Sequence, residues 1–346
     1  MAWLDPIRLC LRLARFLPLC AVPLAWNWFC AQEPIAQRRL AELAPEVDAL
    51  VSGHGIWTTA DLRALRLACL KRLPAPDILV LGGSRAFPIS TELLGAGRVF
   101  NATVSRGDLE DSVAWFQAAV SAGKTPGAVL LEINPMLTQA GVDEREALTF
   151  SYGQALGRYG LQPYWRYLSR LARIESARES FQPRSPEWGI WTQGSTRAWI
   201  APDGAVHWRD RESAAELERV VHARMNDLEP NDRIWRTQSV PAARDRRLLT
   251  LFLDDLHAHG VRVAAFLAPV HPEAYAFYRA AGGYDETWLR QEFSSRGVPV
   301  IGSFSPQTTN AAPSDFFDDV HPRPELLRRI LNPAATTLLS RAGSVR

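Results

Sequence analysis

The stretch that decides the fold reads Asp77-Ile78-Leu79-Val80-Leu81-Gly82-Gly83-Ser84. A short, mostly apolar run of this kind predicts a strand that is buried on both faces, as the strands of parallel sheets are. The two glycines end the strand and allow backbone angles and close approaches that a Cβ atom would forbid. We therefore expect a sharp turn that lifts the Ser84 side chain out of the sheet edge.

A second motif, Asp318-Asp319-Val320-His321, lies near the C-terminus. A serine hydroxyl is a poor nucleophile unless a base lies within hydrogen-bond reach and a third group fixes the tautomer of that base. Ser84, His321 and Asp318 are therefore the candidate nucleophile, base and orienting carboxylate. Each motif also has an ordinary explanation, because serines after strands often cap helices or bind phosphate and Asp-x-x-His is short enough to occur by chance.

Strands and helices are predicted to alternate along the chain. Strands are expected at about residues 77–82, 98–101, 127–133, 261–268 and 298–302, with helices at residues 108–122, 245–259 and 284–296 between them. This alternation predicts an α/β fold, a doubly wound parallel sheet of about five strands. Ligands of such sheets bind beyond the carboxyl ends of the strands, and Ser84, Gly107 and Asn134 each follow a predicted strand. His271 follows the fourth strand, so it is a candidate substrate contact or rival base, with a structural role as the alternative.

The sheet domain is predicted over residues 77–346, after a helical lead-in at residues 33–76. Within it, about residues 140–245 exceed a normal crossover and form a predicted insertion. The second half of the insertion surrounds the turn Pro202-Asp203-Gly204 and favours a hairpin or an irregular cap; its tryptophans are Trp188, Trp191, Trp199 and Trp208. Tryptophan rings can stack on sugars, but aromatic filling of a small cap is the simpler interpretation.

The N-terminal segment predicts export. Arginines at positions 8, 12 and 15 precede residues 16–31, which carry no charge. A basic flank before an apolar run is typical of a signal peptide or a signal anchor, here over residues 1–32. The run is shorter than the ~20 residues of a comfortable span, so an amphipathic or buried helix is the alternative. We expect a retained inner-membrane anchor with the domain on the periplasmic side, or secretion if the segment is cleaved.

The composition of the 346 residues is that of an ordinary globular protein, with 47% hydrophobic and 22% charged residues. The net charge of +2 gives no reason to expect a nucleic-acid partner. Of the four cysteines only Cys69 lies beyond the N-terminal segment, which excludes a disulfide or a multi-thiolate zinc site within the domain. Neither Gly-x-Gly-x-x-Gly nor a P-loop is present, so we expect no cofactor. His207 and His222 have acidic residues nearby but no second histidine or cysteine, so we expect no metal.

On these motifs the chain resembles the SGNH/GDSL hydrolase superfamily, over four short blocks between about residues 77 and 335. The resemblance implies that Ser84 is the nucleophile, His321 the base and Asp318 its orienting partner. It also implies two oxyanion donors, the backbone N–H of Gly107 and the side chain of Asn134. The first block usually reads Gly-Asp-Ser and here reads Gly-Gly-Ser-Arg, and the third usually reads Gly-x-Asn-Asp and here reads Glu-Ile-Asn-Pro. The Gly-Ser-Arg form, with Asn101 opening the second block, is similar to the branch of alginate O-acetyltransferases and lipoteichoic acid D-alanylation proteins.

The expected function is serine-dependent acyl transfer in the cell envelope, as an esterase or an O-acyltransferase acting on an acylated glycan or a related polymer. The partners would be that ester or glycan and a membrane-embedded acyl donor. Arg85 directly follows the nucleophile, so it is expected either to contact an anionic substrate or to pack the start of a helix. The alternatives are a catalytically silent scaffold of the same fold and a protein that binds phosphate through Ser84.

Overall fold

The computed structural model describes residues 43–58, 62–95, 97–105, 107, 109–133, 159, 198–207, 219, 221–223, 225, 243–280 and 283–340. The chain divides into two compact units. The first comprises Met1–Pro45 and Gln162–Thr196, and almost all of it lies outside the described residues. The second comprises Glu46–Leu161 and Arg197–Arg346 and carries both sheets. The predictions for residues 1–32, for Asn134 and for most of the insertion, including Trp188, Trp191 and Trp208, lie outside the described residues.

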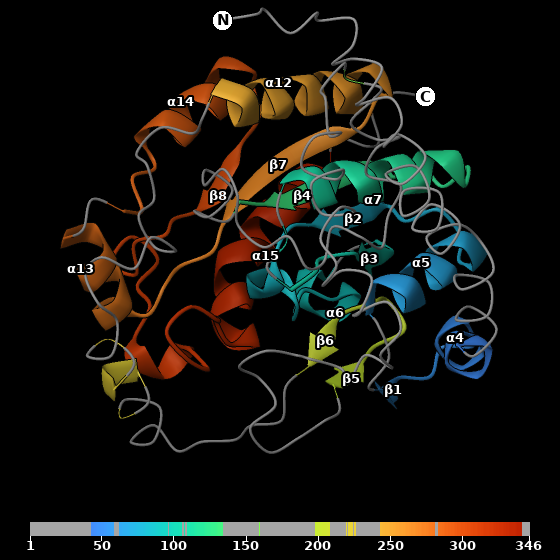
Figure 1. Ribbon diagram of the computed structural model, residues 1–346, viewed down its shortest axis with the longest axis horizontal. Helices are drawn as coiled ribbons and strands as arrows, with labels where there is room; N and C mark the ends of the chain where they lie inside the picture. The colour runs from blue at the N-terminus through green and yellow to red at the C-terminus, as the bar shows by residue number, and fades with distance from the viewer. Residues whose placement is uncertain are drawn as a thin grey trace, which may run out of the picture. The chain divides into compact units, whose positions relative to one another are not determined.

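The centre of the second unit is a parallel sheet (Figure 1). Its strands are β2 (Ile78–Leu81), β3 (Val99–Asn101), β4 (Ala128–Glu132), β7 (Arg262–Leu267) and β8 (Val300–Gly302). Neighbours lie in the order β3-β2-β4-β7-β8, and every pair is parallel. The predicted five-strand parallel α/β sheet is therefore confirmed for this unit. Because the chain leaves β2 toward one edge and β4 toward the other, the order reverses between these two strands, where such sheets bind ligands.

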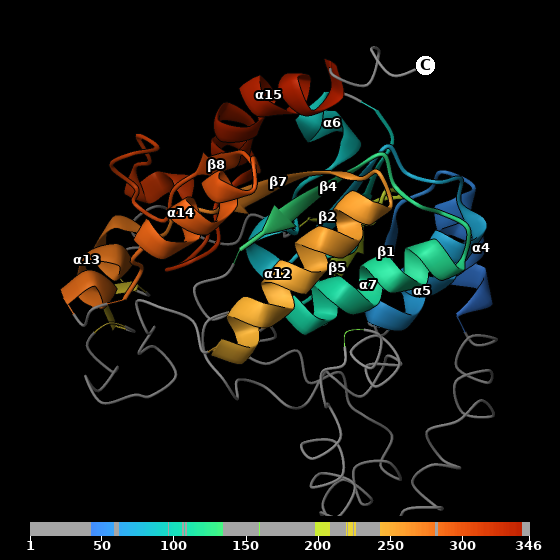
Figure 2. The same ribbon diagram turned by 90° about the horizontal axis from the view of Figure 1, so that it is seen from above.

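Helices cover both faces of this sheet. Their bounds are α4 (Ala44–Val51), α5 (Leu62–Arg72), α6 (Thr91–Leu94), α7 (Leu109–Ser121), α12 (Ala243–Ala258), α13 (Pro272–Ala280), α14 (Thr287–Ser295) and α15 (Pro324–Ser340). Helices α5, α7 and α12 lie along one face, and α6 and α15 lie along the other (Figure 2). The predicted helices at 108–122, 245–259 and 284–296 correspond to α7, α12 and α14, whereas α6, α13 and α15 have no predicted counterpart.

The core explains why β2 and β4 read as unbroken apolar runs. Both strands are buried along their whole length, so neither face selects polar residues. On the side of α6 and α15, strand residues such as Val80, Leu130 and Phe266 belong to one buried cluster with Leu93 and Leu327. Each fully buried side chain of this size stabilises the fold by about 1.5–3 kcal/mol. The strands that carry the site residues are therefore held rigidly.

A second, antiparallel sheet has the order β1-β5-β6. It joins β1 (Ile56–Thr58), from the lead-in, to β5 (Ala198–Ile200) and β6 (Val206–His207), from the insertion. The predicted hairpin of the insertion is present, since β5 and β6 pair across the turn at Pro202-Asp203-Gly204. Its partner β1 was not expected, because a three-residue strand leaves little sequence pattern. This small sheet ties the lead-in to the insertion.

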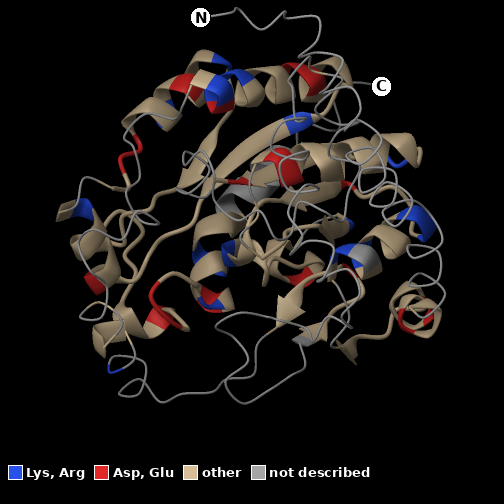
Figure 3. Cartoon of the chain, in the orientation of Figure 1, with Lys and Arg blue, Asp and Glu red and all other residues tan. Residues whose placement is uncertain are grey.

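The surface of the described part has mixed charge. Acidic and basic residues are interspersed along the outer helices instead of gathering by sign (Figure 3). Surface pairs such as Arg296 with Asp254 and Glu292 are typical of it. No helix in the described stretches is long and apolar enough to cross a membrane.

Candidate active site

The turn after β2 carries the candidate nucleophile. Gly82 has a φ of +127°, which favours glycine, and a Cβ atom there would lie 2.6 Å from the carbonyl oxygen of Glu132. The carbonyl of Gly82 accepts the N–H of Val104, and Ser84 opens a short 3₁₀ turn, Ser84–Ala86. The glycine turn thus places Ser84 at the carboxyl end of β2, beside the point where the strand order reverses.

The loop that carries the candidate base closes on itself. Phe316 and Pro322 form an isolated antiparallel bridge, and the N–H of Phe317 donates to the carbonyl of His321. Inside this loop, Oδ1 of Asp318 accepts the backbone N–H groups of Val320 and His321, each at 2.8 Å. The carboxylate is therefore held by backbone bonds of its own loop, independently of any contact with the imidazole.

Three side chains from the two ends of the domain form one hydrogen-bonded line. Ser84 Oγ lies 2.8 Å from His321 Nε2, and His321 Nδ1 lies 2.9 Å from each oxygen of Asp318. An ionised carboxylate can only accept, so Nδ1 carries the proton and donates it, which leaves Nε2 to accept the hydroxyl proton of Ser84. This is the tautomer that a general base requires.

The charge state of Asp318 fits that assignment. Burial acts to raise the pKa of Asp318, but the charge of His321 and the hydrogen bonds from His321 and from two backbone N–H groups outweigh it and hold the pKa below its usual value. Asp318 and His321 are both buried. The carboxylate is therefore ionised at neutral pH and shielded from water.

Of the two predicted oxyanion donors, Gly107 lies in the described part of the chain and Asn134 does not. The N–H of Gly107 donates to the carbonyl of Val104 at 3.0 Å, so this donor is already engaged. Gly107 is packed tightly, because a Cβ atom there would lie 2.2 Å from the carbonyl oxygen of Gly82. Within the described part of the chain the N–H of Ser84 donates to no acceptor, which leaves it available to an oxyanion.

Arg85 and His271, the predicted substrate contacts, are both buried. Arg85 Nη2 donates to the hydroxyl of Tyr284 at 3.2 Å, and its guanidinium lies over the Tyr284 ring. The ring of His271 packs edge-on against Phe316, and its backbone N–H donates to the carbonyl of Asp319. His271 thus supports the loop of the candidate base, and the imidazole that contacts Ser84 is that of His321. Their roles toward a substrate remain predictions.

Asn101 fixes the segment that follows Ser84. Its buried amide nitrogen donates to the carbonyls of three residues in that segment, Ala86, Phe87 and Ile89. Its amide oxygen accepts the N–H of Thr103 at 3.0 Å. The sequence pointed to this position only as the first residue of a block, because the carbonyls it binds belong to a turn whose path the sequence does not specify.

Glu132 is a residue of the site that the sequence analysis did not single out. It ends β4, is fully buried, and its Oε2 accepts the N–H of Gly83 at 2.6 Å. Burial raises the pKa of Glu132, opposed by the charge of Arg85, the Gly83 N–H and the charge of His321. Its signal in the sequence was a carboxylate at the end of an apolar buried strand, where an acid is costly unless it has a partner.

No family model matches this chain. No curated protein matches it either. The described residues hold no group of three or more His, Cys, Asp or Glu side chains that could bind a metal ion.

Proposed function

We propose that this protein is a serine-dependent acyl-transfer enzyme, an esterase or an O-acyltransferase. The observation that carries the proposal is the line from Ser84 Oγ through His321 to Asp318, with contacts of 2.8 and 2.9 Å. Nucleophilic catalysis by serine needs a base within hydrogen-bond reach and a group that orients the base. All three are buried or half-buried at the carboxyl edge of a rigid parallel sheet.

The chemistry follows from the proton positions. His321 Nε2 takes the hydroxyl proton as Ser84 Oγ attacks the acyl carbonyl, and Asp318 stabilises the imidazolium that results. The proton then passes to the leaving oxygen, and an acyl-serine remains. In the second half, His321 takes a proton from the acceptor as the acceptor oxygen attacks the acyl carbonyl; the bond from the acyl group to Ser84 Oγ then breaks and the proton passes from His321 to Ser84. Water as the acceptor gives an esterase, and a sugar hydroxyl gives an O-acyltransferase.

The tetrahedral oxyanion needs preorganised donors. The N–H of Ser84 is one candidate, and Gly107 and Asn134 are the others that the resemblance to the SGNH family proposes. Gly107 would have to share its proton between the Val104 carbonyl and the oxyanion. Losing one such donor typically costs about 10²–10³ in rate.

The finer assignment rests on the resemblance. We propose an SGNH hydrolase-like domain with a flavodoxin-like sheet, which the strand order β3-β2-β4-β7-β8 supports. A basic flank and an apolar run at residues 1–32 support an inner-membrane anchor or a signal peptide, with the domain on the periplasmic side. The substrate would then be an acylated envelope glycan or a related polymer, with a membrane-embedded partner as acyl donor.

The direct test is labelling of the full chain with a fluorophosphonate, which reacts with activated serines. We expect the wild type to label and Ser84→Ala and His321→Ala to lose labelling. Ser90→Ala is the matched control, because Ser90 is buried six residues further on and its hydroxyl caps α6 by accepting the N–H of Leu93. A folded wild type that does not label would contradict an activated serine.

One observation favours a second candidate, a catalytically silent scaffold of the same fold. The N–H of Gly107 is bonded to Val104, so the oxyanion donors are less complete than the line of Ser84, His321 and Asp318. A scaffold would keep the fold without turnover. Labelling of Ser84 together with hydrolysis of a p-nitrophenyl ester would exclude it.

A further inference from the structure

Glu132 lies directly against the turn that carries Ser84. Strands β2 and β4 pair in parallel with Leu81 opposite Leu131, so the next positions along the two strands are Gly82 and Glu132. Gly82 has no room for a Cβ atom, because Oε2 and Cβ of Glu132 would lie 2.6 and 2.7 Å from it. The carboxyl group of Glu132 therefore occupies the space next to residue 82 that a side chain would need.

The carboxyl group is bonded to the turn itself. Its Oε2 accepts the N–H of Gly83 at 2.6 Å, a short bond with no solvent to compete for it. The backbone of Glu132 is fixed from the other side, since it pairs with Phe266 on β7. Glu132 thus connects the Gly82-Gly83 turn to the central strand of the sheet.

The other polar groups of the turn are already used. The Gly82 carbonyl accepts from Val104, and the Gly83 carbonyl accepts from Ala86. With the Gly83 N–H directed to Glu132, the next backbone N–H, that of Ser84, is left free on the described residues. The direction of this N–H and of Ser84 Oγ both depend on the peptide that Glu132 holds.

We propose that Glu132 is a positioning residue: by reaching from β4 to the Gly83 N–H, it orients Ser84 toward His321 and aims the Ser84 N–H at the oxyanion. The inference rests on the proposed function for its effect on rate. The property that matters is the reach of the side chain, because the contact is a hydrogen bond to a neutral N–H. A carboxylate drawn back by one methylene loses the bond, whereas an amide of the same length keeps it.

This distinction defines the experiment. Glu132→Gln keeps an acceptor oxygen at the same distance without the ionisable group, and Glu132→Asp keeps the carboxyl group but withdraws it. We expect the fluorophosphonate labelling rate of Glu132→Gln to stay within about fivefold of the wild type and that of Glu132→Asp to fall about 10²-fold, the usual effect of a misplacement near 1 Å. With a p-nitrophenyl ester the loss should appear in kcat, with KM little changed.

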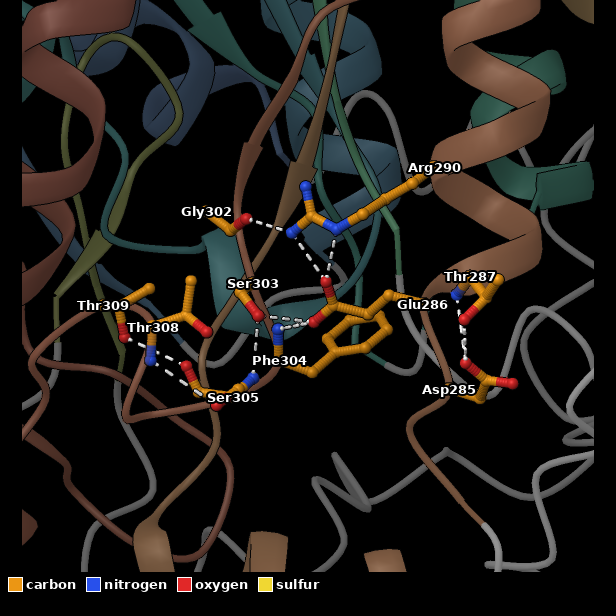
Figure 4. A network of polar contacts seen from close by, with 10 residues as sticks. All are labelled: Asp285, Glu286, Thr287, Arg290, Gly302, Ser303, Phe304, Ser305, Thr308 and Thr309. Atoms are coloured by element: carbon orange, nitrogen blue, oxygen red, sulfur yellow. Dashed lines mark hydrogen bonds and ion pairs between the residues drawn. The ribbon is translucent and has the colours of Figure 1, made fainter.

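A matched control comes from Glu286, another carboxylate that holds backbone at the end of a strand (Figure 4). It accepts from the Ser303 hydroxyl at 2.6 Å and from the N–H of Phe304, and it pairs with Arg290. This network lies after β8, two strands away from β4 in the sheet order. Glu286→Asp should lower the melting temperature and leave the labelling rate unchanged, which separates positioning from general loss of stability.

Hydrogen–deuterium exchange of the peptide that contains Gly83 reads the contact without any activity. We expect wild type and Glu132→Gln to protect this peptide and Glu132→Asp to expose it. If the wild type fails to label but the three proteins show this exchange pattern, the proposed function is contradicted and the contact between Glu132 and the Gly83 N–H stands. The inference would be overturned if Glu132→Asp labelled at the wild-type rate, or if Glu132→Asp labelled faster than Glu132→Gln.

Discussion

At the level of single residues, Asp318 accepts more hydrogen bonds than the imidazole alone supplies. Two backbone N–H groups of its own loop bind Oδ1, and His321 Nδ1 binds both oxygens. The same carboxylate therefore folds the loop and orients the base. Removing the Asp318 carboxylate should therefore lower stability through the lost backbone bonds of the loop and lower activity through the lost bond to the imidazole.

The first prediction concerns Asp318→Asn. An amide can present its NH₂ to Nδ1, which would put the imidazole proton on Nε2 and leave Ser84 without a base. We expect kcat/KM for an ester to fall by on the order of 10⁴, as in serine triads generally. Stopped or continuous ester assays on the folded variant would measure this. A loss below about tenfold would contradict a role in setting the tautomer.

Acid titration is the companion measurement. Because the folded pKa of Asp318 is depressed, its stabilising contribution is present above the unfolded pKa of about 3.9 and is lost as the pH falls through the folded value. The difference in unfolding free energy between wild type and Asp318→Asn should therefore be largest near neutral pH and shrink in acid. A difference that stays constant down to pH 2 would contradict an ionised Asp318.

At the level of elements, the turn between β2 and Ser84–Ala86 depends on two glycines that meet. Gly82 is at a positive φ against Glu132, and Gly107 approaches the carbonyl of Gly82. Gly82 is required both for its backbone angle and for space, whereas Gly107 is required for space. Most other glycines with positive φ, such as Gly123, lie in open surroundings.

The corresponding prediction compares Gly82→Ala with Gly123→Ala. Both add the strain of a positive φ, about 1–2 kcal/mol, but only Gly82→Ala also meets atoms at 2.6 Å. We expect Gly123→Ala to cost about 1–2 kcal/mol and Gly82→Ala about 2–5 kcal/mol, the added part being overpacking. Urea unfolding of both variants measures the difference. Equal losses would mean that the turn relaxes away from Glu132.

At the level of the whole second unit, Arg66 joins the two sheets. From α5 it donates Nε to the carbonyl of Gly204, in the β5–β6 turn, and Nη1 to the carbonyl of Thr103, after β3. Its guanidinium also lies over the ring of Phe87, three residues after Ser84. Backbone bonds from Asn101 to Asp203 and from Val206 to Phe87 run across the same boundary. The small sheet is therefore part of the support of the site.

We accordingly predict that Arg66→Met lowers the free energy of unfolding by about 2–4 kcal/mol, because two buried carbonyls lose their donor while the cost of burying a charge is relieved. Hydrogen exchange should rise in the peptides of β5 and β6 and stay unchanged in β4. Arg72→Met is the control, since Arg72 is on the same helix with an exposed partner, Asp48, and should cost less than about 0.5 kcal/mol. Equal hydrogen exchange in Arg66→Met and Arg72→Met would contradict the conclusion that Arg66 joins the two sheets.

The sequence by itself determined the parts of the fold that depend on a few consecutive residues. The apolar run 78–81, the glycine pair after it and the alternation of strands with helices predict a parallel sheet, because burial on both faces and the backbone freedom of glycine are properties of a few consecutive residues. The short Asp318–His321 spacing is likewise local, and the loop bonds of Asp318 follow from it. Helix α13 and strand β1 were missed, since short segments carry little periodic signal. Helix α15 is long and amphipathic but contains Pro333, and an interior proline predicts the end of a helix.

Only the tertiary structure decided which of these features meet. Ser84 and His321 are 237 positions apart, and their contact depends on the packing of every strand between them. The partners of Glu132, Asn101 and Arg66 are backbone groups of distant turns, which have no side-chain identity for a sequence pattern to reveal. A sequence specifies such contacts only through the whole fold, because a backbone N–H or carbonyl is the same at every residue and its position alone makes it a partner.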